Sequence, residues 1–165
     1  MTNLRTTQYA GPHSQLDIRS YISGYFDGEG CFCVAISPRA TLVVGWEVRP
    51  SVSISQNGDR SEVIELVKEH FGCGTIRPDR SDKTIKWETR RLSDLVERVL
   101  PHFRVFPLLS GKRRDVELLD HICSAMRAGR HRTESGLLEI ASLAKAMNPS
   151  GSRRYTVEMI EATMR

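Results

Sequence analysis

The sequence predicts an α+β fold in which one antiparallel sheet carries helices on one of its faces. Four stretches alternate apolar and polar residues with the period of two that half-buried strands show, and short turn sequences group them into two hairpins. Apolar residues at helical spacing precede each hairpin and follow the second one. The expected order is therefore α-β-β-α-β-β-α with further C-terminal helices, which leaves the second face of the sheet to solvent or a ligand.

The first helix is expected over residues 17–27, where apolar side chains recur at helical spacing and Asp17 is a suitable N-cap. Gly28 and Gly30 end this helix, because glycine readily adopts conformations outside the helical region. A strand over residues 31–36 follows and ends at a Ser-Pro pair. The helix should thus lead directly into the first strand.

A long second strand is expected over residues 42–56, with apolar side chains on one face and polar side chains on the other. The apolar face comprises Trp46, Val48, Val52 and Ile54. The spacing of Asp59 and Glu62 matches a capping box, which predicts that the next helix starts at Asp59. This helix should end at Phe71, with Gly72 after its last turn.

The second hairpin and the C-terminal helices complete the expected fold. The hairpin strands should span residues 74–80 and 83–90, joined by a Ser-Asp turn. Helical periodicity then predicts four further helices. They are expected over residues 92–100, 112–126, 134–147 and 156–164.

The composition indicates a single globular domain. The chain has 165 residues, and no apolar run approaches the roughly 20 residues that span a bilayer, so we expect no membrane partner. We interpret residues 17–165 as one domain and residues 1–16 as a flexible tail. The tail contains no acids, so a transit peptide remains an alternative. The four cysteines lack disulfide or zinc spacing, which favours an intracellular location, in a bacterial or archaeal cytoplasm or an organelle.

The basic residues favour a polyanionic partner. The net charge is +4, and arginine supplies 19 of the 24 basic residues. Its guanidinium group matches phosphate and the guanine edge, although GC-rich codon usage explains the bias equally well. One face of the expected strands mixes Arg and Lys with Ser, Thr and a few acids, which suits either nucleic-acid contact or simple solvation. This face comprises Arg39, Glu47, Arg49, Ser51, Ser53, Thr75, Arg77, Asp79, Thr84 and Lys86.

Residues 21–30, with the sequence YISGYFDGEG, carry the most specific signal. Gly24 and Gly28 are four residues apart, and small residues at this spacing let a second helix approach closely. Asp27 and Glu29 lie at the helix C-terminus, where the helix dipole disfavours acids by about 0.3–1 kcal/mol each. A hard cation would resolve this conflict. An Asx turn with glycines at positive φ is the alternative interpretation, and it explains the glycines but not the acids.

Residues 22–30 resemble the LAGLIDADG motif position by position, with conservative departures at Ser23, Gly28 and Glu29. The element order and the chain length also resemble those of LAGLIDADG homing endonucleases that carry a single motif. The resemblance covers residues 18–122. It implies a saddle-shaped sheet and a homodimer in which two motif helices pack at a two-fold axis. The interface residues that it implies are Tyr21, Ser23, Gly24 and Asp27.

The resemblance also implies a metal site at the end of the motif. The Glu29 carboxylate and the main-chain carbonyl of Gly28 would bind a divalent cation, normally Mg²⁺, whereas Asp27 would order the turn. Two-metal phosphodiester chemistry needs such a cation to activate water and to stabilise the leaving oxygen.

Four residues match catalytic positions of the family. They are Glu29, Gln56, Arg60 and Lys112. A turn hydrogen bond is the alternative role of Gln56, and a solvated helix start is that of Arg60. An alternative register puts Ser110 in place of Lys112, which would then only hold backbone phosphate.

The function implied is that of a site-specific double-strand DNA endonuclease with a long, nearly palindromic target. The DNA-binding residues implied are Cys33, Ala35, Ser37, Arg39, Glu47, Arg49, Ser51, Ser53, Thr75, Arg77, Asp79, Thr84, Lys86 and Glu88. A non-catalytic RNA maturase or a DNA-binding regulator on the same fold is the alternative. Retention of the acid Glu29 favours the enzyme.

Overall fold

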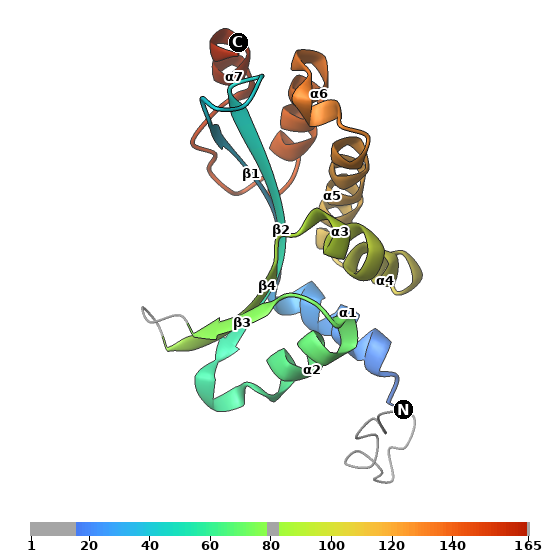
Figure 1. Ribbon diagram of the computed structural model, residues 1–165. Helices are drawn as coiled ribbons and strands as arrows, with labels where there is room; N and C mark the ends of the chain where they lie inside the picture. The colour runs from blue at the N-terminus through green and yellow to red at the C-terminus, as the bar shows by residue number, and fades with distance from the viewer. Residues whose placement is uncertain (1–15, 79–82, 165) are drawn as a thin grey trace.

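The computed structural model describes residues 16–78 and 83–164, which form a four-stranded antiparallel sheet with helices along one face (Figure 1). The strands stand in the order β1-β2-β4-β3, as two adjoining hairpins. Their bounds are β1 Gly30–Pro38, β2 Trp46–Asn57, β3 Thr75–Pro78 and β4 Thr84–Thr89. The expected α+β fold and element order are therefore confirmed, while the proposed tail up to residue 15 and Asp79 lie outside the described residues.

Helices precede, connect and follow the hairpins. The principal helices are α1 Ile18–Glu29, α2 Glu62–Phe71, α5 Lys112–Arg127, α6 Glu134–Lys145 and α7 Val157–Thr163. A continuous helical segment comprises α3 Leu92–Asp94, the π-helical turn Leu95–Val99 and α4 Leu100–Val105. Short 3₁₀ turns cover Gly58–Arg60 and Arg130–Arg132. None of the helices in the described ranges is both long and apolar enough to cross a membrane.

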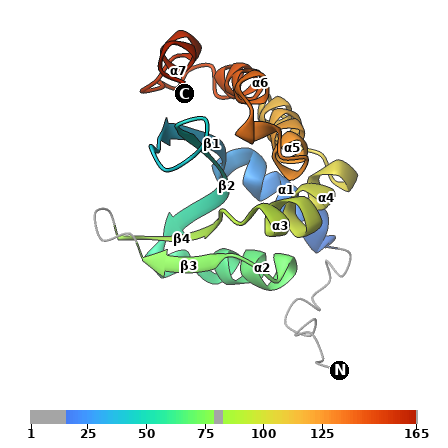
Figure 2. The same cartoon turned by 45° about the horizontal axis from the view of Figure 1, so that its top comes forward.

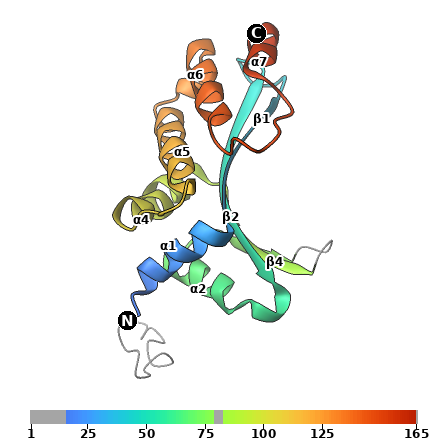
Figure 3. The same cartoon turned by 180° about the vertical axis from the view of Figure 1, so that it is seen from behind.

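The helices leave one face of the sheet uncovered. Seen from opposite sides, α1, α2, α5 and α6 lie on the same side of a long, curved β2 (Figures 1 and 3). Turning the molecule shows that the β1–β2 hairpin and the β3–β4 hairpin are twisted relative to each other (Figure 2). The covered face buries side chains such as Val34, Val52 and Trp87, each fully inaccessible to solvent. The burial of these apolar side chains supplies most of the hydrophobic stabilisation of the core.

The strand register places the predicted polar side chains on the uncovered face. Cys31 lies opposite Ser53, which lies opposite Glu88, which lies opposite Thr75, so one row crosses all four strands. Successive side chains of a strand point to opposite faces, and polar residues therefore share the open face throughout. The predicted alternation along the second strand is confirmed by the burial of Trp46, Val48, Val52 and Ile54.

Helix α1 leads into β1 without an intervening loop. Asp17 caps α1 as expected, since its side chain accepts a hydrogen bond from the main-chain N–H of Arg19. Gly30 begins β1, and a Cβ atom there would lie only 2.6 Å from the Phe26 side chain. The close passage of β1 over α1 therefore requires glycine, and it fixes Glu29 at the junction of the two elements.

Several boundaries differ from the sequence-based expectation. Helix α1 runs through Gly28 to Glu29 rather than ending at Asp27. The second strand starts at Trp46 rather than at residue 42, because a turn that ends at Gly45 with φ of 74° precedes it. Asp59 does not cap α2; it lies in the 3₁₀ turn, and α2 starts at Glu62. The helix expected to end at residue 100 continues to residue 105, since the π-helical turn Leu95–Val99 changes the hydrogen-bond pattern just before Pro101.

The C-terminal segment protects the exposed edge of β1. The Asn148 side-chain amide donates to the Phe32 carbonyl at 2.9 Å, and the Arg153 guanidinium donates to the Val34 carbonyl at 3.0 Å. Arg153 also donates to the carbonyl of Ala144 at the end of α6. These side chains satisfy acceptors that a neighbouring strand would otherwise use. Arg153 therefore has a structural role.

Candidate functional site

The exposed carboxylate of Glu29 lies at the C-terminal end of α1, where the helix meets the polar face of the sheet. It forms no hydrogen bond or ion pair with any residue in the described part of the chain. The preceding carbonyl oxygen, that of Gly28, accepts a hydrogen bond from the Lys112 ammonium at 2.7 Å. A free carboxylate, a polarised carbonyl and a lysine thus meet at the junction of α1, β1 and α5.

Asp27 binds the segment that precedes α5. Its carboxylate accepts from the main-chain N–H groups of Leu109 at 3.1 Å and Ser110 at 3.0 Å, and from the Ser110 hydroxyl. Burial alone would raise the pKa of Asp27, but these hydrogen bonds and the nearby Lys112 hold it below its usual value. Asp27 therefore stays ionised and fixes the start of α5, which brings Lys112 to Gly28.

Gln56 and Arg60 approach α1 from β2 and from the turn that follows it. The Gln56 amide donates to the Tyr25 hydroxyl, and its oxygen accepts from the Asn57 N–H at 2.8 Å. Arg60 is exposed in the 3₁₀ turn. Both line a groove of about 440 Å³ between α1 and α2, together with Tyr21. Tyr25, the partner of Gln56, lies one helical turn before Glu29 on α1, and Gly30 pairs with Ile54, so Gln56 lies close to the α1–β1 junction.

The side of α1 that carries Gly24 and Gly28 does not pack against the described residues. Tyr21 is 40% exposed, and Gly24 and Gly28 are exposed on the same side of the helix. A Cβ atom added at Gly24 or Gly28 would meet no atom within 4 Å. This side of α1 therefore offers a second helix a surface on which two backbones can approach.

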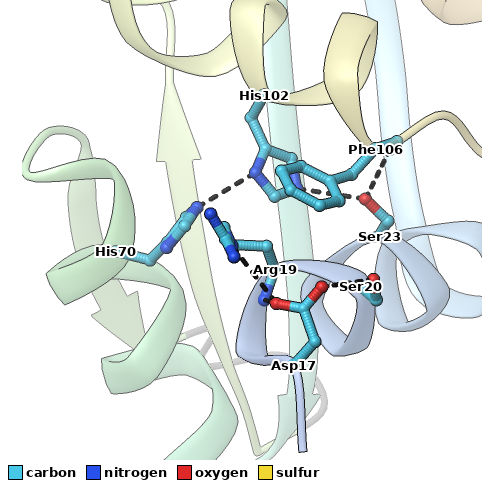
Figure 4. A network of polar contacts seen from close by, with 7 residues as sticks. All are labelled: Asp17, Arg19, Ser20, Ser23, His70, His102 and Phe106. Carbon is cyan, nitrogen blue, oxygen red and sulfur yellow. Dashed lines mark hydrogen bonds and ion pairs between the residues drawn. The ribbon is translucent and has the colours of Figure 1, made fainter.

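The structure corrects the expectation for Ser23, which points into the molecule. Only 5% of Ser23 is exposed, so it cannot line an interface on the open side of α1. Its hydroxyl donates to the Phe106 carbonyl at 2.6 Å and lies 3.0 Å from His102 Nε2 (Figure 4). The hydroxyl is needed there because both partners would otherwise be buried without a bond.

A pair of histidines extends this contact, and the sequence analysis did not anticipate it. His102 Nδ1 lies 3.0 Å from His70 Nε2, so α1, α2 and α4 are joined by one hydrogen-bonded chain (Figure 4). Since the Ser23 hydroxyl donates to Phe106, His102 must donate from Nε2 and accept from His70 at Nδ1. Burial, His70 and Arg19 lower the pKa of His102 to about 4. The hydrogen-bonded chain of Ser23, His102 and His70 is therefore uncharged at neutral pH.

The sequence gives only a weak signal for the hydrogen-bonded chain of Ser23, His102 and His70. His70 and His102 are 32 residues apart and share no ligand spacing. Only the position of His102 on the buried side of its helix, between apolar neighbours, could have indicated a structural role.

Acidic side chains on the open face of the sheet are paired with bases. Glu88 contacts Arg77 at 3.2 Å, Lys86 at 3.3 Å and Arg90 at 3.0 Å. On the longer hairpin, Glu47 contacts Arg39 at 2.6 Å and Arg49 at 3.7 Å. Bases thus outnumber acids in both clusters, and the face is positively charged overall.

The other predicted face residues vary in exposure. Ala35 and Thr75 are exposed, whereas Cys33 and Ser37 are partly buried. Ser53 is only 5% exposed, so its side chain is covered by its neighbours in the central row of the sheet. The structure thus brings most of the predicted polar set onto one surface, with Ser53 as the member least accessible to a ligand.

The family model described as LAGLIDADG endonuclease matches residues 22–123, which is more than half of the chain. In the curated proteins, the chain is 28% identical over 130 residues to a probable intron-encoded endonuclease 2 of Neurospora crassa. This match covers 78% of the chain but only 29% of the fungal protein. The chain thus spans less than a third of that relative.

Two solved structures of homing endonucleases also resemble this chain. The crystal structure of the homing endonuclease I-TnaI superposes with a TM-score of 0.76 at 30% identity, over 88% of this chain and 94% of that one. The LAGLIDADG homing endonuclease I-LtrWI, bound to target DNA, superposes with a TM-score of 0.78 at 30% identity. That match covers 79% of this chain and 44% of I-LtrWI, so the described fold corresponds to about half of the longer protein.

Proposed function

The chain belongs to the LAGLIDADG endonuclease family, and from this premise we propose that it is a site-specific double-strand DNA endonuclease acting as a homodimer. The related I-TnaI is named a homing endonuclease, and I-LtrWI was solved on its target DNA. The target would be nearly palindromic and about two helical turns long, because each copy presents one sheet to one half-site. We further propose that residues 17–165 form this one nuclease domain.

The observation that carries this proposal is the free, exposed carboxylate of Glu29 beside the Gly28 carbonyl and Lys112. An acid with no partner at a helix C-terminus is unfavourable for the helix alone, since the helix dipole is negative there. A carboxylate next to a carbonyl oxygen that holds a cation is the arrangement that metal-dependent phosphodiester hydrolysis needs.

The donors at this junction fit a divalent metal ion in part. The Glu29 carboxylate and the Gly28 carbonyl are hard oxygen ligands, and the bound Lys112 ammonium indicates that the carbonyl attracts positive charge. In the described residues, no group of three or more His, Cys, Asp or Glu side chains is arranged to hold a metal. One copy therefore supplies only part of a coordination shell, and a second Glu29 and DNA phosphates would complete it.

We propose Mg²⁺ as this metal, held by Glu29 and the Gly28 carbonyl. Bound there, the cation would lower the pKa of the attacking water and stabilise the leaving oxygen. Lys112 would neutralise charge on the phosphate beside the junction. Gln56 and Arg60 would contact the water and the phosphates near the scissile bonds, from the groove that they line with Tyr21.

Dimerisation is supported by the open side of α1. Gly24 and Gly28 present a helix surface on which an added Cβ atom would meet none of the described atoms within 4 Å, and two such surfaces can pack about a two-fold axis. One copy contains one Glu29, whereas cutting both strands requires two reacting phosphates. In a dimer, a second copy would supply the part of the DNA-bound I-LtrWI that this chain does not match, since the match covers 44% of that protein.

DNA binding is assigned to the open face of the sheet. The proposed contacts are Cys33, Ala35, Ser37, Arg39, Glu47, Arg49, Ser51, Ser53, Thr75, Arg77, Asp79, Thr84 and Lys86. Exposed arginines at both ends of the sheet would hold phosphates, while the row of small polar residues between them would lie near the bases.

A cleavage selection tests this function. Purified protein is incubated with a plasmid library that carries randomised inverted repeats of roughly 22 base pairs, about two helical turns. Cut ends are captured and sequenced in Mg²⁺, in Ca²⁺ and in EDTA. We expect a single enriched family of inverted repeats, cut on both strands in Mg²⁺ and uncut in EDTA. Specific binding without cleavage in any divalent metal would favour a regulator, and binding of structured RNA alone would favour a maturase.

A further inference from the structure

Glu88 is the centre of an ionic cluster on the open face of the sheet. Its side chain is only 10% exposed, because three basic side chains surround it. Arg77 lies on β3, Lys86 lies two residues before Glu88 on β4, and Arg90 follows the end of β4. One carboxylate thus holds cations from two strands and from the connection to α3.

Both oxygens of this carboxylate are occupied. Oε1 accepts from Arg90 Nη2 at 3.2 Å and lies 3.3 Å from Lys86. Oε2 lies 3.0 Å from Arg90 Nε and 3.2 Å from Arg77. Glu88 therefore has no free oxygen for a base amino group while these pairs persist, which differs from the direct DNA contact expected from the sequence.

The cluster remains charged at neutral pH. Burial works to raise the pKa of Glu88, but Lys86 and Arg90 lower it below its usual value overall. Arg77 and Arg90 line a groove of about 600 Å³ that runs from the hairpin to α3 and also contains Arg91 and Arg98. Phosphates that enter this groove must compete with Glu88 for Arg77 and Arg90.

We infer that Glu88 is a positioning residue for DNA specificity, which rests on the proposed nuclease function. It holds Arg77, Lys86 and Arg90 in one arrangement and withholds them from the phosphates of non-target DNA. Non-target DNA is held only by contacts between cations and phosphates, which are independent of sequence, so a carboxylate that competes for these cations weakens non-target binding in full. Target DNA is held by base contacts as well and depends less on these cations, and Glu88 thus widens the gap in affinity between target and non-target DNA.

The test compares Glu88→Gln with Glu117→Gln. Glu117 pairs with the exposed Arg113 on α5 at 3.0 Å, so its substitution removes the same charge outside the open face. The probes are a random-sequence duplex of roughly 22 base pairs and the duplex enriched in the cleavage selection. Kd is measured between about 50 and 300 mM salt, and a melting curve of each variant verifies that it is folded.

We expect Glu88→Gln to bind the random duplex about tenfold more tightly at low salt. Its plot of log Kd against log salt should be steeper by about 1 to 2, because one or two cations gain phosphate partners. The ratio of target to random affinity should fall about fivefold or more. Glu117→Gln should change each quantity less than twofold.

A second substitution guards against a purely structural effect. Arg90→Gln should weaken binding to the random duplex only slightly in the native background, where Glu88 neutralises this cation, and several-fold in the Glu88→Gln background. Equal effects of Arg90→Gln in both backgrounds would overturn the inference. If Glu88→Gln does not fold, Glu88→Asp replaces it, since the shorter acid keeps the charge but loses part of its contacts and should show a smaller change of the same sign.

The outcomes separate the two proposals. A native protein that binds no duplex DNA contradicts both the nuclease function and the inference. A native protein that binds and cuts DNA, with a Glu88→Gln variant whose salt dependence equals that of Glu117→Gln, contradicts the inference alone.

Discussion

The Lys112 ammonium lies 2.7 Å from the main-chain carbonyl oxygen of Gly28, although 84 residues separate them in the sequence. This contact joins the first residue of α5 to the last turn of α1. It exists because Asp27 fixes the Leu109–Ser110 segment that precedes α5. Glu29 therefore directly follows a residue whose carbonyl holds a cation that the fold fixes in place.

The first prediction concerns this cation. Lys112→Met should slow cleavage of the selected target by about 10²–10³, because a fixed positive charge would no longer stabilise charge that develops on the phosphate. Binding to the same duplex in Ca²⁺ should change only a few-fold. Single-turnover cleavage and Kd are the measurements. Arg113→Met, one residue later and exposed, is the control and should cut at nearly the native rate.

A second prediction concerns the open side of α1. Gly24→Leu should abolish the dimer without unfolding the chain, because a Cβ atom at this position meets none of the described atoms within 4 Å, whereas a leucine side chain would separate two packed helices. Sedimentation velocity measures the mass, and circular dichroism measures the fold. Ser124→Leu, at an exposed position of α5, should remain dimeric. A dimeric Gly24→Leu variant would show that the copies pair elsewhere.

The buried hydroxyl of Ser23 gives a third prediction. Ser23→Ala should lower the free energy of unfolding by about 1–3 kcal/mol, since His102 and the Phe106 carbonyl would lose a buried partner. Urea denaturation measures this change. Ser20→Ala is the control on the same helix, because Ser20 is exposed and bonds only to Asp17. Equal losses for both variants would contradict the inward role of Ser23.

The fourth prediction follows from the pKa of His102, which is lowered from 6.5 to about 4. In the unfolded chain the imidazole takes up its proton near pH 6.5, whereas in the folded chain it does so only near pH 4. The stabilisation is therefore complete above about pH 6.5 and is lost as the pH falls toward 4, by on the order of 3 kcal/mol.

Urea denaturation between about pH 7.5 and 4.5 measures this dependence. His102→Gln should be less stable at neutral pH and should lose less stability over the same interval. Parallel pH profiles for the native chain and the variant would assign the acid sensitivity to other groups.

Local patterns in the sequence were sufficient for the elements and their order. Alternation of apolar and polar residues identified the two faces of β2, and the glycines around Glu29 marked the end of α1. Both signals are local, because a side chain's face depends on its own position in the strand or helix. The prediction that the second helix starts at Asp59 was wrong for a related reason. Residue spacing cannot distinguish a helix start from a 3₁₀ turn just before it.

Contacts between distant segments could not be derived in this way. Ser23 was assigned to the open side of α1 with its small neighbours, whereas its true partner His102 lies 79 residues away. The choice between Ser110 and Lys112 depended on the path of the chain before α5. That path is set by hydrogen bonds to Asp27, which have no sequence period.

The most direct test of the central claim is cleavage of the selected target by Glu29→Gln in Mg²⁺, with binding measured in parallel in Ca²⁺. The substitution preserves shape and removes only the charge of a carboxylate that has no partner in the described chain. We predict that cleavage falls below detection while Kd in Ca²⁺ stays within about threefold of the native value, since DNA binding is assigned to the sheet. A Glu29→Gln variant that cuts at the native rate would contradict the assignment of this junction as the catalytic centre.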